Sequence, residues 1–179
     1  QLGVDFGLRT ATKPDSQDVC FIGSTIGRAG FLEPRLSFNA AEVVDQSGAK
    51  VGEVSAVELV TLGQRRGLGL GGGDKRYVVA VDVPARRVTV GDEASLFVES
   101  ENLRSMVWPH KEDEQLVLNG EVLVQGSAHG ERAAARIECH GGEYRMVWAR
   151  PNRRIAPGQT VVFYDKADQV VLGGAIVAP

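Results

Sequence analysis

The sequence has few of the residues that most often carry redox, metal or nucleophilic chemistry, with two cysteines and three histidines among 179 residues. Cys20 and Cys139 are too far apart to indicate a disulfide framework, and this usage is typical of a reducing compartment. Zinc sites need two spaced pairs of ligands, whereas Cys139-His140 is one adjacent pair, and His110 and His129 stand alone. We therefore predict no metal site and a cytoplasmic protein.

Long apolar runs and a large excess of charge of one sign are missing as well. No stretch is long enough to cross a bilayer and the start carries no signal-peptide pattern, so we predict no membrane association. The formal net charge of -3 gives no global attraction to nucleic acid, although a local basic patch is compatible with it. The composition, 43% hydrophobic and 24% charged, indicates a folded chain of one or two domains. Because it begins at Gln1 without an initiator methionine, we expect it to be part of a larger protein.

Short β-type segments separated by turn residues make up most of the chain. Glu42–Asp45 and Lys50–Val54 predict a hairpin, and Val57–Leu62 is expected to continue as a strand. Further strands are expected at Arg76–Val83, Arg86–Gly91, Ser95–Val98, Leu103–Val107, Gln115–Gln125, Arg132–Glu138, Glu143–Ala149, Thr160–Tyr164 and Val170–Val177. One short helix is expected near the N-terminus, over Ile26–Leu36. Because crossover helices are missing, the pattern favours a mainly β fold with an antiparallel barrel or sandwich.

A glycine-rich segment at residues 63–75 interrupts this pattern. It has no Gly-Lys-Ser/Thr ending and no helix pattern after it, which excludes a phosphate loop of the usual kind. One interpretation is that Arg65 and Arg66 bind phosphates there. The other is that the segment is a solvated turn between domains. We predict a central unit with a small β-roll at residues 1–72 and a C-terminal barrel at residues 73–179.

Cys20 is the one candidate nucleophile. A reactive cysteine needs a lowered pKa, which Lys13 favours and the carboxylates of Asp15 and Asp18 oppose. A buried structural cysteine is the alternative that composition alone favours, and the apolar residues that follow Cys20 are compatible with it. The residues alone leave both interpretations open.

Several motifs resemble one family. Residues 11–22, Ala-Thr-Lys-Pro-Asp-Ser-Gln-Asp-Val-Cys-Phe-Ile, resemble the sulfur-transfer cysteine segment of bacterial tRNA-specific 2-thiouridylases. Thr61–Gly69 is similar to the glycine-arginine signature of the same family. The motifs that follow in the family's order are Tyr77–Val79 with Asp82, Val88–Gly91, Pro157–Gln159 with Val162–Tyr164, and Val171–Ile176.

This resemblance implies an ATP-dependent 2-thiolation of the wobble uridine of tRNA. In such enzymes an N-terminal domain, which this chain lacks, binds ATP with Mg and carries a second cysteine. The implied role of Cys20 is to hold a persulfide loaded by a sulfur-relay donor protein and later to form a disulfide with that second cysteine. The barrel is implied to be similar to the second domain of translation elongation factors. The fragment alone is expected to be inactive.

The resemblance also implies where the anticodon arm of tRNA is held. Gln159 matches a tRNA-contacting glutamine, although a turn residue after Pro-Gly is the plain alternative. Ser127 and Ala128 align with an Arg-Tyr pair that contacts tRNA in the family, so this chain lacks the positive charge of that arginine. Arg65 and Arg66 are expected to help dock tRNA. Two further departures are Val54 in place of a histidine and Val60 in place of an aromatic residue. The alternative function is a non-catalytic RNA- or ribosome-binding barrel with a structural cysteine.

Overall fold

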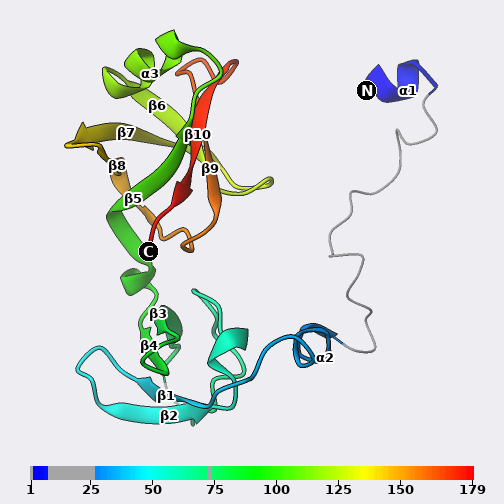
Figure 1. The fold of residues 1–179 in the computed structure, drawn as a ribbon, viewed down its shortest axis with the longest axis vertical. Coiled ribbons are helices and arrows are strands. Elements are labelled where there is room, and N and C mark those ends of the chain that lie inside the picture. The colour runs from blue at the N-terminus through cyan, green and yellow to red at the C-terminus, as the bar shows by residue number, and fades with distance from the viewer. Residues whose placement is uncertain (1, 8–26, 72–73) are drawn as a thin grey trace. The chain divides into compact units, whose positions relative to one another are not determined.

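The computed structural model describes residues 2–7, 27–71 and 74–179, and the chain divides into two compact units at residues 1–39 and 40–179. The described part of the first unit contains the short helices α1 (Leu2–Asp5) and α2 (Gly27–Leu32) (Figure 1). Helix α2 lies within the range expected to be helical. Its end is stabilised by the guanidinium of Arg35, which lies 4.1 Å from the ring centre of Phe31.

The second unit begins with a four-stranded sheet in the order β2-β1-β4-β3 (Figure 1). Its strands are β1 (Ala41–Val44), β2 (Lys50–Val54), β3 (Tyr77–Asp82) and β4 (Arg87–Gly91). The hairpin expected from the sequence is confirmed, since β1 and β2 pair antiparallel. Asp45 fixes the turn between them, because its Oδ1 accepts the backbone N–H groups of Ser47 and Ala49 at 2.9 and 3.0 Å. The buried valines of the four strands, with Val57 and Leu68, form the core of the sheet.

The remaining strands close into a barrel in the order β10-β5-β8-β7-β6-β9. They are β5 (Phe97–Val107), β6 (Glu121–Gln125), β7 (Ala133–His140), β8 (Glu143–Arg153), β9 (Thr160–Tyr164) and β10 (Val171–Val177). Every neighbouring pair in this barrel is antiparallel. Phe163, Ile137 and Met146 are at most 1% exposed in its interior. The predicted mainly β fold with an antiparallel barrel is confirmed.

One expected strand is partly a helix. The strand expected at Gln115–Gln125 was wrong over its first residues, because α3 (Lys111–Leu118) occupies them and β6 begins only at Glu121. The helix is favoured at its start by the carboxylate of Asp113, whose Oδ2 accepts the backbone N–H of His110 at 3.0 Å. Its apolar residues place Val117 in the barrel core. In the described part of the chain, no helix is long and apolar enough to cross a membrane.

Two other expectations differ from the structure. The strand expected at Val57–Leu62 is a 3₁₀ turn at Val57–Leu59 followed by a loop, because the N–H of Val60 bonds the carbonyl of Val57 at 3.1 Å. The strands expected separately at Ser95–Val98 and Leu103–Val107 are one long strand, β5, which a 3₁₀ turn at Ala94–Leu96 precedes.

Strands β3 and β4 belong to the sheet and not to the barrel. The sequence assigned residues 73–179 to the barrel, but β4 pairs parallel with β1, from Glu42 opposite Arg87 to Val44 opposite Thr89. Strand β3 in turn pairs with β4, so both are held on the sheet by main-chain hydrogen bonds. The first barrel strand therefore begins at Phe97. The glycine-rich segment connects parts of the same sheet.

Candidate nucleic-acid interface

Cys20, the predicted sulfur carrier, lies outside the described residues. The predicted tRNA-contacting residues all lie in the second unit, where they can be followed from the strands that carry them. They fall into two groups, one at an end of the barrel and one beside the sheet.

Gln159 and the pair Ser127–Ala128 come from connections at the same end of the barrel. Strand β6 ends opposite the start of β9, with Gln125 facing Val162, so the loop after β6 and the turn before β9 are neighbours. A Cβ placed on Gly126 would lie only 2.6 Å from Cδ1 of Ile155, which shows how closely the two connections pack. The side chains of Gln159, Ser127 and Ala128 are all exposed.

The loop between β6 and β7 is a tight turn held by side chains of the barrel. Nε2 of Gln125 donates to the carbonyl of Gly130 at 3.0 Å, and the hydroxyl of Tyr164 donates to Oε1 of Gln125 at 3.1 Å. The N–H of Gly130 closes the turn on the carbonyl of Ser127 at 3.0 Å. The loop therefore presents Ser127 and Ala128 in a defined position.

The second group is the loop of Gly63–Arg66, which is fixed to strand β3. The N–H of Gly63 donates to the carbonyl of Val78 at 2.8 Å, and the N–H of Val78 donates to the carbonyl of Gln64 at 2.9 Å. The Gln64 side chain accepts from the N–H of Thr61 and donates to the carbonyl of Arg66. Because these bonds use the main chain, the side chains of Arg65 and Arg66 remain exposed.

Arg65 lines a basic cavity of about 410 Å³ next to the sheet. The charged residues in its wall are Arg65, Lys75, Arg76 and one carboxylate, Asp74. Three cations around one hollow form a local positive region on a chain whose formal net charge is -3. Such a hollow suits a phosphate group, which cationic side chains bind without regard to base sequence. Lys75 and Arg76 were not predicted as part of this region, although Lys75 ends the glycine-rich segment at residues 63–75 and Arg76 directly follows it.

The glycines of this segment hold it against β2. Gly69 has φ +65°, and a Cβ on it would lie 2.7 Å from the carbonyl oxygen of Glu53 in β2. Gly52 of β2 is equally close to the segment, since its Cβ would meet Cδ2 of Leu70 at 2.9 Å. The position of the basic cavity therefore depends on a backbone contact that a larger residue cannot make.

Replacing Gly69 with alanine is expected to lower the free energy of unfolding by on the order of 2–3 kcal/mol, because a left-handed alanine is strained and its Cβ would push against main chain. The matched control is Gly71→Ala, since nothing lies within 4 Å of its Cβ position and its φ is not positive. That variant should stay within about 0.5 kcal/mol of the unmodified chain. Urea unfolding followed by circular dichroism measures both, and equal effects would contradict the close contact.

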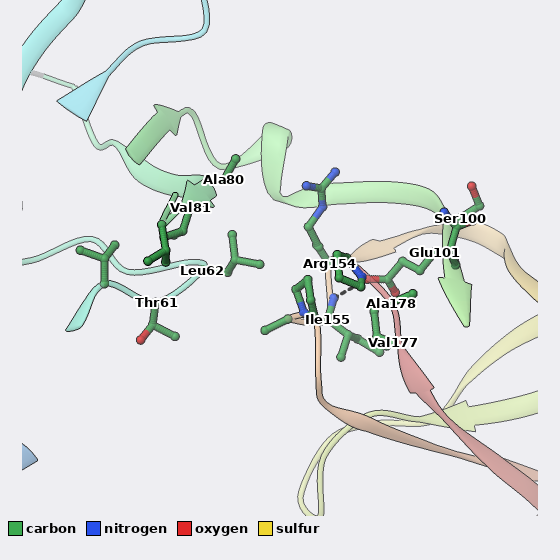
Figure 2. Close-up of a pocket in the computed structure, with 16 residues that line it drawn as sticks. Thr61, Leu62, Ala80, Val81, Ser100, Glu101, Arg154, Ile155, Val177 and Ala178 are labelled. Carbon is green, nitrogen blue, oxygen red and sulfur yellow. Dashed lines mark hydrogen bonds between the residues drawn. The ribbon is translucent and has the colours of Figure 1, made fainter. Parts of the chain in front are cut away.

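A larger cavity of about 560 Å³ lies between the sheet and the barrel end. Figure 2 shows Thr61, Leu62 and Val81 on the side of the sheet facing Ile155 and Val177 on the side of the barrel. Glu101 is the buried acidic residue in this wall, at 9% exposure, and burial raises the pKa of its carboxyl. Its Oε1 accepts the N–H of Ile155 at 2.7 Å, which ties the turn that leads to Gln159 onto β5. Nothing in the sequence singles out Glu101, because it stands among polar residues between the strands predicted at Ser95–Val98 and Leu103–Val107.

The described residues offer no fit for a metal ion or for ATP. Within residues 2–7, 27–71 and 74–179, no three His, Cys, Asp or Glu side chains come together as possible metal ligands. The glycine-rich segment leads into strand β3, so it lacks the helix N-terminus that holds phosphates in nucleotide-binding loops. Cys139 is free and exposed at the end of β7.

Comparison with known proteins identifies both parts of the chain. Residues 29–92 match the family described as tRNA methyl transferase PRC-barrel domain, and residues 98–177 match the aminomethyltransferase beta-barrel domain. Among similar proteins, a tRNA-specific 2-thiouridylase MnmA of Synechocystis sp. is 35% identical over 100% of this chain and 49% of its own length. Those of Saccharopolyspora erythraea and Acidothermus cellulolyticus are 37% and 39% identical, over 99% and 96% of this chain and 50% and 47% of their own lengths.

The chain thus spans about half the length of the curated relatives it matches. The sheet falls within the first matched domain and the barrel within the second. The chain is a homologue of the tRNA-specific 2-thiouridylases, and it spans their PRC-barrel and C-terminal β-barrel domains.

Proposed function

We propose that this chain is the tRNA-holding and sulfur-carrying part of a cytoplasmic tRNA 2-thiouridylase. The observation that carries the proposal is the homology over both domains to proteins named for this activity. The complete enzyme would thiolate the C2 position of the wobble uridine. This chain would bind the anticodon arm and contribute Cys20.

Two exposed regions support a role in tRNA docking. At the barrel end Gln159 lies next to the Ser127–Ala128 loop. Where the family has a charged Arg-Tyr pair, this loop offers a hydroxyl and backbone groups. Arg153 and Arg154 are exposed at the same end, and a Cβ on Gly63 would lie 3.0 Å from Nη2 of Arg153. The loop of Arg65 is therefore adjacent to the barrel end, so an RNA backbone could contact both.

We assign the chemistry of sulfur transfer to Cys20 on the strength of the motif around it. A thiol can carry a persulfide and pass the outer sulfur on, which no hydroxyl or amine in the chain can do. Loading requires a sulfur-relay donor protein. ATP, bound outside this chain, would supply the activation of the C2 oxygen. The residues of this chain would orient the tRNA so that the target base can leave its stack.

The docking role is tested by neutralising the basic cavity. In the double variant Arg65→Gln/Lys75→Gln, tRNA affinity is expected to fall about tenfold at low salt, and the slope of log K against log salt to become shallower by about 0.7–0.9 per lost charge. Fluorescence anisotropy with labelled tRNA over a salt series gives both quantities. The reason is that a variant with fewer cations neutralises fewer phosphates, so fewer counterions leave the RNA when the chain binds.

The matched control is Lys111→Gln/Lys166→Gln, which removes the same charge from exposed positions elsewhere on the barrel unit. It should leave affinity within about twofold and the slope nearly unchanged, since those charges would not contact phosphates. Equal losses in the two double variants would show that net charge alone drives binding. That result would reject the basic cavity as a docking site.

A further inference from the structure

A series of side-chain contacts on the outer face of the barrel connects the turn between β9 and β10 to the β6–β7 loop, residues 126–132. Gln125 ends β6 and Tyr164 ends β9. Both lie on the outer face, because the residues before them, Val124 and Phe163, are buried inside the barrel. The register of β6 on β9 makes Gln125 and Tyr164 diagonal neighbours, a spacing that long side chains can bridge.

The amide group of Gln125 is hydrogen-bonded on both sides. Its Oε1 accepts the hydroxyl of Tyr164 at 3.1 Å. Its Nε2 donates to the carbonyl of Gly130 at 3.0 Å and lies 3.5 Å from the carbonyl of Ala128. Since the hydroxyl occupies the oxygen side of the amide, the NH₂ group is turned toward the loop. Tyr164 therefore sets the orientation of the group that holds the loop.

Tyr164 is itself held from the turn between β9 and β10. The guanidinium of Arg132 lies 4.0 Å from the centre of the Tyr164 ring. The same guanidinium forms an ion pair with the carboxylate of Asp168 in that turn. The turn is closed locally, because Oδ1 of Asp165 accepts the N–H of Val170 at 2.9 Å. The tyrosine ring is thus fixed between the barrel wall and a cation that a second loop holds in place.

We propose that Gln125 and Tyr164 are positioning residues for tRNA binding, which keep the β6–β7 loop in the conformation that presents Ser127 and Ala128 to the RNA. The inference rests on the proposed tRNA-docking function and adds residues that act through the loop without touching RNA. Ser127 and Ala128 are exposed and offer only a hydroxyl and main-chain groups. Such groups bind only at hydrogen-bond distance and in the right direction. A loop that had to be ordered during binding would bind more weakly.

Tyr164→Phe tests this role, because it removes the hydroxyl and leaves the ring beside Arg132. We expect the affinity of the whole chain for unmodified tRNA to fall about threefold to tenfold, the effect of losing one hydrogen bond. The slope of log K against log salt should stay the same, since no cation is lost. Fluorescence anisotropy over a salt series measures both. In the free chain labelled with ¹⁵N, the amide signals of Ser127 and Gly130 should shift.

Gln125→Ala removes both sides of the connection and should weaken tRNA binding at least as much as Tyr164→Phe. The double variant should bind no more weakly than Gln125→Ala alone, because the hydroxyl acts through the amide. Additive losses in this cycle would mean that Tyr164 acts on RNA binding by another route, and they would contradict the proposal.

Tyr144→Phe is the matched control, because it removes a hydroxyl that donates at the same distance, 3.1 Å, to Oε1 of Glu114. Tyr144 is partly buried like Tyr164, but its bond joins β8 to α3. Both variants should lower the thermal unfolding midpoint by similar amounts, while the control keeps the tRNA affinity and the loop signals of the unmodified chain. Equal losses of affinity in the two variants would reject the positioning role.

Shifted loop signals with unchanged tRNA affinity in Tyr164→Phe would also reject the positioning role. The double variant of Arg65 and Lys75 tests tRNA docking separately. If that variant loses affinity and Tyr164→Phe does not, the positioning role fails and the docking function stands. If the unmodified chain binds no tRNA, the docking function itself fails, and the inference fails with it.

Discussion

Replacing Cys20 with serine in the complete enzyme is expected to reduce tRNA 2-thiolation at least about 100-fold, the scale on which losing a covalent carrier acts. The assay combines the enzyme with ATP, a persulfide-loaded donor protein and unmodified tRNA, and detects 2-thiouridine by mass spectrometry after digestion. A second readout is the enzyme itself, since the unmodified protein should gain the mass of one sulfur atom on Cys20. The serine variant should gain none.

The physical reason lies in the sulfur chemistry. In the proposed mechanism the Cys20 thiolate would attack the outer sulfur of the donor's persulfide, so a new S–S bond would form on Cys20 while the donor's S–S bond breaks and the donor leaves as a thiolate. A second cysteine would then attack the inner sulfur of Cys20, which would form a disulfide and release hydrosulfide toward C2. A cellular dithiol would have to reduce that disulfide before the next turnover. Serine can take part in none of these exchanges.

Cys139→Ser is the matched control, because Cys139 is the other cysteine of the chain and is exposed on the barrel. We expect full thiolation from this variant. Undiminished thiolation by Cys20→Ser would favour the other interpretation, in which the chain is an RNA- or ribosome-binding barrel whose cysteine is structural. Loss of thiolation in both variants would assign the effect to protein damage and would contradict a special role for Cys20.

Phe163→Ala is expected to give the largest loss of stability among single substitutions considered, about 3–5 kcal/mol. Phe163 is 0% exposed in β9, and its ring centre lies 6.1 Å from that of Trp108. Removing the ring leaves a cavity in a closed barrel whose strands cannot move inward without breaking their ladders. Thermal unfolding should show a midpoint roughly 6–20 °C lower, given about 2–4 °C per kcal/mol for a chain of this size.

Phe97→Ala makes the same chemical change at the start of β5, where the ring is 49% exposed. We expect it to lower the unfolding free energy by at most about 1 kcal/mol, because half of the ring already contacts water. Circular dichroism at 25 °C should show unchanged strand content in both variants. A loss of similar size in the two would mean that Phe163 does not pack as described.

The sequence could predict the barrel because its local signals agree with one another. The apolar, β-branched residues of the predicted strands Thr160–Tyr164 and Val170–Val177 match β9 and β10, and Asp45 with Gly48 makes the first hairpin turn recognisable. Helix α3 was missed because Leu116-Val117-Leu118 is as suitable for a strand as for a helix. The hydrogen bond from the backbone N–H of His110 to Asp113 favours the helix over the strand, and the apolar pattern does not reveal this local bond.

Relations between distant residues could not be read in the same way. The parallel pairing of β1 with β4, which places Glu42 opposite Arg87, has no connecting tight turn from which it could be predicted. This pairing places β3 and β4 in the sheet and not in the predicted barrel. The proximity of Gln159 to Ser127 follows from the register of β6 on β9, which a single sequence does not specify. The burial of Glu101 could not be predicted for a related reason, because it depends on the turn at Ile155 folding over this residue. The role of Cys20 stays a prediction.

The pairing of β5 with β10 has a consequence for how the protein is made. Leu103 lies opposite Val177, roughly 70 positions later, so the barrel closes only after the last of its strands has left the ribosome. The sheet of β1 to β4 can form well before that. During the interval β5 and β9 each expose a main-chain edge able to pair with another chain. Slow synthesis or truncation before Val171 should therefore produce aggregates, and a chaperone that covers strand edges should raise the yield of folded protein.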